Sequence, residues 1–287
     1  MVDKIPDELY QNFKDNLGVF FVGAGLSIPA GLPTWDQLLD ELIAEAAKQP
    51  WFSPNKKDDY AVLRKEGKFL FLAEEIKNDL GGMYSDYMEK RFVATVYEPT
   101  INHEYIAKTQ SSLIITINYD RLIERAYNKI YGDYPEPYLY SDSRAAANLF
   151  WKSRFFVLKA HGDAKKDIES IVLSQKDYRR TLYREPGYRS LLQAIFTTKS
   201  ILFVGVSMTD PEFNQLLDYL NDSYHGGGPR HYLLIESGKC VPTMSRRFYD
   251  DFNIETITYE NADGKHGKIT EFLKGLSEAA PCHNIKF

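Results

Sequence analysis

A glycine-rich turn near the start of the chain has residue types and spacing that suit phosphate chemistry. An apolar run over residues 19–22 is broken by Gly23, Ala24 and Gly25, and Ser27 follows two residues later. Glycines in such a turn let backbone N–H groups approach a diphosphate, and a following helix offers its positive end to the phosphates. The turn therefore predicts a dinucleotide site in which these four residues bind the cofactor.

The same turn departs from the pattern of a dehydrogenase. Ile28 stands where GxGxxG has its third glycine, and the next glycine is Gly31. No acidic residue sits clearly at a second strand end about 20 residues later, where a dehydrogenase would hold the ribose. A hydride-transfer enzyme is therefore not indicated.

Polar or glycine-containing turns also follow three later apolar runs. These pairs of run and turn are Ser112–Ile117 with Asn118-Tyr119-Asp120, Phe155–Ala160 with His161-Gly162-Asp163, and Ser200–Val204 with Gly205-Val206-Ser207. Because ligands bind at the carboxyl ends of strands in an open parallel sheet, we expect all four turns to meet in one crevice.

These residue types suit proton transfer and the orientation of a water or a hydroxyl. Asn118 has an amide donor and an acceptor, enough to orient a water or a ribose hydroxyl. His161, with an unperturbed pKa of about 6.5, can accept a proton near neutrality. Asp120 can orient the site or stabilise positive charge, and Gly205 and Ser207 stand in the last turn, where they would approach a bound dinucleotide. We take Asn118, His161 and Asp120 as the candidate catalytic residues.

Structural roles remain open for each of these residues taken singly. Asn118 can be a turn former or helix cap, Asp120 can be an N-cap, and a histidine before glycine is often structural. The basic and aromatic cluster Tyr178–Arg184 can touch nucleic acid, but its helical spacing favours an exposed helix face.

Short, unalternating apolar runs separated by helical segments predict the fold class, an α/β protein. We expect a Rossmann-like parallel sheet with helices on both faces, formed by a single domain over residues 1–287. Helical patterns span 7–16, 59–96 with a break at Gly81-Gly82, and 209–220; another begins at Thr34, a candidate N-cap, and runs to about Ala47. Residues 50–110 are predicted to form a helical insertion that covers the end of the first strand, and Ile254–Ile257 is a weaker strand candidate.

Composition narrows the possible environments and ligands. The chain has 287 residues, of which 44% are hydrophobic, and a net charge of −5, so no general field attracts nucleic acid or an anionic membrane. Its two cysteines form no CxxC pair and its histidines no i, i+4 pair, so we predict no metal site and no disulfide framework. We expect a cytoplasmic protein without a membrane segment and without direct nucleic-acid binding.

The four turns, in this order, resemble the NAD site of the sirtuin superfamily: a GAGxS loop, a TxNxD segment, a His-Gly pair and a late GxS turn. The resemblance covers roughly residues 17–237. The two CxxC pairs of deacetylase sirtuins are missing, so a protein deacylase is not expected. The continuation Gly31-Leu32-Pro33-Thr34-Trp35 is closer to the zinc-less SIR2-like domains of bacterial anti-phage systems. It adds Thr34 and Trp35 to the cofactor-binding residues, although Trp35 also suits a core position.

The resemblance implies an NAD⁺ hydrolase that releases nicotinamide and ADP-ribose and acts in defence by depleting NAD. Such domains are related to the Thoeris effector and to SIR2 proteins that accompany HerA-type ATPases or short Argonautes. It therefore implies control by one of these partner types or by assembly into a homo-oligomer. Two other functions stay open, a module that senses NAD or ADP-ribose without cleaving it, and an ADP-ribosyltransferase.

Overall fold

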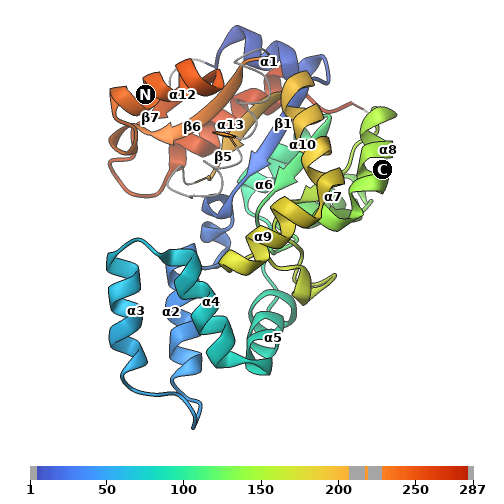
Figure 1. Ribbon diagram of the computed structural model, residues 1–287. Coiled ribbons are helices and arrows are strands. Elements are labelled where there is room, and N and C mark those ends of the chain that lie inside the picture. Colours follow the sequence, from blue (N-terminus) through green and yellow to red (C-terminus); the bar gives the residue numbers. More distant parts are fainter. Residues whose placement is uncertain (1–4, 207–216, 219–227, 284–287) are drawn as a thin grey trace.

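A seven-stranded parallel sheet forms the centre of the molecule in the computed structural model, which describes residues 5–206, 217–218 and 228–283 (Figure 1). Its strands are β1 (Gly18–Val22), β2 (Leu113–Thr116), β3 (Pro137–Leu139), β4 (Val157–Lys159), β5 (Ser200–Val204), β6 (His231–Glu236) and β7 (Ile254–Tyr259). All residues of β1, β2, β4 and β5 are buried, as expected for a sheet covered on both faces. The predicted Rossmann-like α/β class is confirmed.

The strand order is β3-β4-β2-β1-β5-β6-β7, with every neighbouring pair parallel. The chain fills one side of β1 with β2, β3 and β4 and then returns to place β5 on the other side. The strand order therefore reverses between β1 and β5. In open sheets of this kind, ligands bind in the crevice at such a reversal.

Eight helices in the described part of the chain cover the two faces of the sheet. They are α1 (Asp7–Lys14), α6 (Ile101–Lys108), α7 (Leu122–Tyr131), α8 (Ser143–Trp151), α9 (Gln175–Arg184), α10 (Pro186–Thr198), α12 (Pro242–Phe252) and α13 (Gly267–Ala279). Apolar residues of α1, α6, α7 and α13 form one core cluster with the sheet, and those of α8, α10 and α12 form another. In α13, for example, Ile269, Phe272, Leu273 and Leu276 repeat at helical spacing and are buried.

Four helices between β1 and β2 lie together as a separate layer (Figure 1). They are α2 (Trp35–Ala46), α3 (Lys56–Lys65), α4 (Phe69–Leu80) and α5 (Gly82–Glu89), followed by a π-helical turn, Lys90–Ala94. These helices share a third core cluster, whereas α6 packs on the sheet. The expected break is present because Gly81, with φ of 53°, ends α4. The predicted boundaries of the helical insertion, residues 50–110, stay a prediction. In the structure, α2, which precedes residue 50, packs with α3, α4 and α5 in the third core cluster.

Some details differ from the expectations or lie outside the described residues. The sequence does not predict strand β3, because three residues beginning with Pro137 give no apolar run. The strand can form because it lies at the edge of the sheet, where the missing N–H of a proline is tolerated. The weak candidate at 254–257 is strand β7. The helix expected over 209–220 lies outside the described residues, apart from 217–218. Among the helices that the structure describes, none is long and apolar enough to cross a membrane.

Candidate functional site

The turns after β1 and β5 pack directly against each other. Gly23 N donates to Val204 O at 3.0 Å, and Gly25 N donates to Gly205 O at 2.9 Å. A Cβ on Gly23 would lie 2.5 Å from Gly205 O, and one on Gly25 would lie 2.9 Å from Gly205 Cα. Gly205 itself has φ of 67°, a conformation that favours glycine. The three glycines therefore allow two loops to touch at the point where the strand order reverses.

The sequence predicted that the N–H groups of this glycine turn approach a diphosphate, and the contact between the loops gives Gly23 and Gly25 another role. Their N–H groups donate to backbone carbonyls, so the amides of Gly23 and Gly25 are not available to a diphosphate. The loop continues into two short 3₁₀ turns, Ala24–Leu26 and Ile28–Ala30, and not directly into an α-helix. The next helix, α2, has its first turn closed by a capping box in which Gln37 N donates to Thr34 Oγ1 and Thr34 N to Gln37 Oε1.

Asn118 joins the turn after β2 to the turn after β1. Its Nδ2 donates to Gly23 O at 3.1 Å and to Ser27 Oγ at 3.0 Å. Its backbone N donates to Thr116 Oγ1 at 3.1 Å, and that hydroxyl donates to Val22 O at 3.0 Å. The side chain is thus fixed between two strand ends, and the residue is only 6% exposed.

The other amide atom of Asn118 is unused. Its Oδ1 is buried and accepts no hydrogen bond from any residue that the structure describes. A buried acceptor without a donor costs about 1–3 kcal/mol, so such atoms in native proteins require an explanation. A ligand hydroxyl or a water that donates to Oδ1 would satisfy it.

His161 follows β4 at the same edge of the sheet. Because Thr116 pairs with Lys159, Asn118 and His161 each stand two residues beyond paired positions. The Tyr178 hydroxyl lies 3.2 Å from His161 Nδ1 and 3.4 Å from Nε2, and the two rings are nearly perpendicular. Burial lowers the pKa of His161 to about 3. The imidazole is therefore neutral at physiological pH, so it can accept a hydrogen bond, but the same burial makes it a weak base.

Asp120 has the capping role that its sequence position allowed. Its Oδ1 accepts from Leu122 N at 3.0 Å, at the first residue of α7. The carboxylate is buried and directed to this helix start. The structure thus places Asp120 two residues from Asn118 but gives it a local structural partner.

A buried ion pair below this segment was not found from the sequence. Lys159 at the end of β4 lies 3.1 Å from Glu124 of α7, and the two side chains are 1% and 0% exposed. The Lys159 ammonium also donates to Asn118 O at 3.5 Å and to Asp120 O. Lys159 therefore anchors the backbone that carries Asn118. The available signal was a single lysine inside an otherwise apolar run.

Asp163, the last residue of the His-Gly-Asp turn, is also structural. It is fully buried and accepts from Arg121 Nε at 2.9 and 3.1 Å, and its Oδ1 accepts from the N–H groups of Lys165 and Lys166. The pair between Asp163 and Arg121 joins the turn after β4 to the start of α7.

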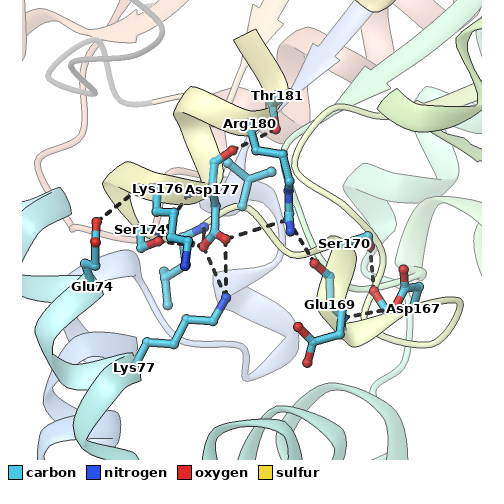
Figure 2. A network of polar contacts seen from close by, with 12 residues as sticks. Glu74, Lys77, Asp167, Glu169, Ser170, Ser174, Lys176, Asp177, Arg180 and Thr181 are labelled. Carbon is cyan, nitrogen blue, oxygen red and sulfur yellow. Dashed lines mark hydrogen bonds and ion pairs between the residues drawn. The ribbon is translucent and has the colours of Figure 1, made fainter. Parts of the chain in front are cut away.

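A polar network connects the helical layer to the helix that carries Tyr178 (Figure 2). Asp177 of α9 is buried and accepts from Ser174 N and Oγ at 3.0 and 2.8 Å, and Lys77 of α4 lies 3.3 Å away. Lys176 N of α9 donates to the carboxylate of Glu74, which also belongs to α4, at 3.1 Å. The cluster Tyr178–Arg184, expected to be an exposed helix face, thus begins beside a buried contact and turns Tyr178 toward His161.

The predicted site residues therefore fall into three groups. One hydrogen-bonded cluster contains Gly23, Gly25, Ser27, Asn118 and Gly205, with Ala24 inside its first loop. His161 and Asp120 lie on adjoining turns of the same sheet edge. Thr34 and Trp35 belong to the helical layer: Thr34 caps α2, and Trp35 packs edge-on against Phe69 with ring centroids 5.8 Å apart. Ser207 lies outside the described residues.

No group of three His, Cys, Asp or Glu side chains within the described residues is arranged to hold a metal ion.

A family model described as "SIR2-like domain" matches residues 112–257. The chain belongs to the SIR2-like domain family. The matched region starts at β2 and includes Asn118, Asp120, His161 and Gly205, and the predicted resemblance to the sirtuin superfamily is confirmed.

Named relatives of this SIR2-like chain are longer proteins. "NAD(+) hydrolase ThsA" of Bacillus cereus (strain MSX-D12) is 27% identical over 299 residues, which cover 98% of this chain and 57% of the relative. "Defense-associated sirtuin 2" of Bacillus subtilis is 30% identical over 224 residues, 76% of this chain and 21% of the relative. A solved complex of a Sir2 homologue with NAD is 15% identical, covers 96% of this chain and 94% of its own, and gives a TM-score of 0.47.

Proposed function

We propose that this chain hydrolyses NAD⁺ to nicotinamide and ADP-ribose. The observation that carries the proposal is Asn118, a buried amide bonded to Gly23 and Ser27 whose Oδ1 has no donor among the described residues. The names of the relatives, "NAD(+) hydrolase ThsA" and "Defense-associated sirtuin 2", support NAD⁺ as the substrate.

The reaction breaks the bond between the nicotinamide nitrogen and the anomeric carbon of its ribose. The bonding pair leaves with the nitrogen, so nicotinamide departs neutral and positive charge develops on the sugar. A water oxygen then bonds to the anomeric carbon, and one water proton is released. Catalysis of this kind depends on holding the two reactants in position more than on a strong base, because the electrophile is a cation.

Asn118 and His161 supply the two functions that the water needs. Asn118 Oδ1 accepts a hydrogen bond from the water or a ribose hydroxyl and so orients it. His161, kept neutral by burial, accepts a hydrogen bond from the same water or from a ribose hydroxyl, and the released proton passes to solvent, because an imidazole with a pKa of about 3 is too weak a base to keep it. Asp120 acts through the start of α7, where it holds Leu122 N, and is a positioning residue in this proposal.

The remaining cofactor contacts are proposed from the family motifs. They are Gly23, Ala24, Gly25, Ser27, Thr34, Trp35, Gly205 and Ser207. Gly23 and Gly25 would contact the cofactor through their Cα atoms, because their N–H groups donate to Val204 O and Gly205 O. The loop contact between Gly25 and Gly205 gives the first and the late motif a fixed relation in space. We also propose that the activity depletes NAD in a defence response and that a homo-oligomer or a HerA-type or Argonaute-like partner restrains it.

The test is incubation of the purified chain with NAD⁺ and chromatography of nicotinamide and ADP-ribose. The variants are Asn118→Ala and His161→Ala, and the matched controls are Asn55→Ala and His283→Ala, both at exposed positions. We expect release by the wild type and both controls, and at least a 100-fold loss in each site variant.

The products separate the hydrolase from the two other functions. Binding of NAD⁺ without nicotinamide release, with or without an added HerA-type or Argonaute-like partner, would indicate a sensing module. Nicotinamide release with the ADP-ribose label recovered on protein or nucleic acid would indicate a transferase. Full activity in Asn118→Ala would contradict the role given to its Oδ1.

A further inference from the structure

A pocket of about 350 Å³ lies between the segment after α5 and the start of α7. Its wall contains aromatic and basic side chains, among them Phe92, Tyr119, Tyr134, Arg121, Arg125 and Lys165. Gly23, Ser27, Asn118, His161 and Gly205 are not among its lining residues. The pocket therefore adjoins the proposed hydrolytic site through Asp120, which lines it, but does not include the hydrogen-bonded cluster around Asn118.

The charge of the pocket favours an anion. Three cationic side chains line it, and its one carboxylate, that of Asp120, accepts from Leu122 N. Asp163 and Glu98 pair with Arg121 and Arg125, so these two carboxylates and Asp120 balance the three cations, and a bound anion gains where it replaces the exposed carboxylate of Glu98.

The three cations differ in how firmly they are held. Arg121 is fixed by the buried Asp163 carboxylate at 2.9 Å, so its guanidinium plane has a set orientation. Arg125 pairs with Glu98 at 2.9 Å, but the two side chains are 36% and 77% exposed, and such pairs contribute little and exchange readily. Lys165 has no ion-pair partner for its ammonium among the described residues. Arg125 and Lys165 can therefore turn to a bound anion at small cost.

The aromatic wall favours a planar ring. Phe92 packs edge-on against Tyr119, with centroids 5.6 Å apart and an interplanar angle of 83°. Also in the pocket lining, the Arg121 guanidinium lies 6.0 Å from the centroid of the Tyr134 ring. Aromatic and guanidinium faces of this kind stack on flat heterocycles.

Volume then limits the size of the ligand. Small-molecule pockets span about 300–1,000 Å³, and this one is near the lower limit, which suits one nucleotide and not a dinucleotide. We propose that the pocket binds a nucleoside 5′-monophosphate, with its phosphate at Arg121, Arg125 and Lys165 and its base against Phe92 and Tyr134. This site is independent of whether the chain hydrolyses NAD⁺.

The probe is AMP, titrated into the purified chain by calorimetry, with inorganic phosphate as a second titrant. The variants Arg125→Gln and Lys165→Gln change partly or fully exposed positions, so the fold should be retained, and the melting temperature verifies this. We expect AMP affinity to fall about 10-fold in each variant and to be unchanged in Arg144→Gln, which alters an exposed arginine on α8.

Two comparisons locate the ligand. AMP should bind more tightly than inorganic phosphate, because only AMP has a ring for the aromatic wall, and Asn118→Ala should leave AMP affinity unchanged. The proposal is overturned by any of three results: no AMP binding to the wild type at millimolar concentration, unchanged affinity in Arg125→Gln and Lys165→Gln, or loss of affinity in Asn118→Ala.

Discussion

Replacing Lys159 by methionine should make the stability of the protein strongly dependent on pH. Lys159 and Glu124 are 1% and 0% exposed, with Nζ and Oε1 3.1 Å apart. Burial raises the pKa of the Glu124 carboxyl, and the ammonium of Lys159 is the main group that opposes this shift. Lys159→Met removes that ammonium and leaves the carboxyl in an apolar environment.

The size of the effect follows from the protonation that folding then requires. In Lys159→Met, Glu124 must fold in its neutral form, whereas in the unfolded chain it ionises with a pKa of 4.5. Each pH unit above that value costs about 1.4 kcal/mol, so the cost is about 4 kcal/mol at pH 7.5 and about 1 kcal/mol at pH 5. The sign agrees with a raised folded-state pKa: stability is present at low pH and is lost as the pH rises.

The measurement is urea unfolding of the wild type and Lys159→Met at pH 5 and pH 7.5. The double variant Lys159→Met/Glu124→Leu should lose the pH dependence, because no ionisable group remains in the pair. The control is Lys274→Met, whose partner Glu278 lies 3.9 Å away and is 68% exposed, and which should lose less than about 1 kcal/mol at either pH. An equal loss for Lys159→Met at pH 5 and pH 7.5 would refute the reasoning.

Three further predictions concern the contacts around the site. Gly205→Ala should cost about 1–2 kcal/mol from its positive φ alone, and more because its Cβ would lie 2.7 Å from a backbone nitrogen, whereas Gly238→Ala should be nearly neutral in the same urea experiment. The imidazole of His161, with its pKa lowered to about 3, should show no titration between pH 8 and 5 in an NMR experiment on labelled histidine, and a midpoint near 6.5 would contradict its burial. Lys77→Met leaves Arg180, 3.6 Å away, as the remaining cation beside the buried Asp177 and should cost about 1 kcal/mol, with faster amide exchange in α4. Unchanged exchange would show that the network does not hold the helical layer.

Most of the sheet could be predicted because its strands are buried on both faces and read as apolar runs. The runs at 112–117, 155–160 and 200–204 contain β2, β4 and β5. Strand β3 could not be predicted, because three residues beginning with Pro137 give no run and the strand depends on its single neighbour, β4. The boundary of the helical layer could not be predicted from neighbouring residues either, because it depends on which core cluster each helix packs into.

The sequence predicted that Asn118, His161 and the two glycine turns lie at one edge of the sheet, but not the contacts that they make there. Position after a strand was enough to single out Asn118 and His161, because all parallel strands end at one edge. The glycine turn has another cause than the one expected, a contact between loops more than 170 residues apart in the chain. The pair of Lys159 and Glu124 and the contact of Tyr178 with His161 join different elements, and no spacing along the chain specifies them.

The central position of β1 has a consequence for synthesis of the chain. Phe21 of β1 pairs with Phe203 of β5, about 180 residues later. At roughly 5–20 residues per second, a ribosome needs about 10–40 s between making these two partners. Throughout that interval Gly23 and Gly25 lack the loop on which they rest, so the nascent chain cannot yet have an assembled glycine turn. A protein that consumed NAD⁺ would in this way stay inactive on the ribosome until most of its own sequence had been translated.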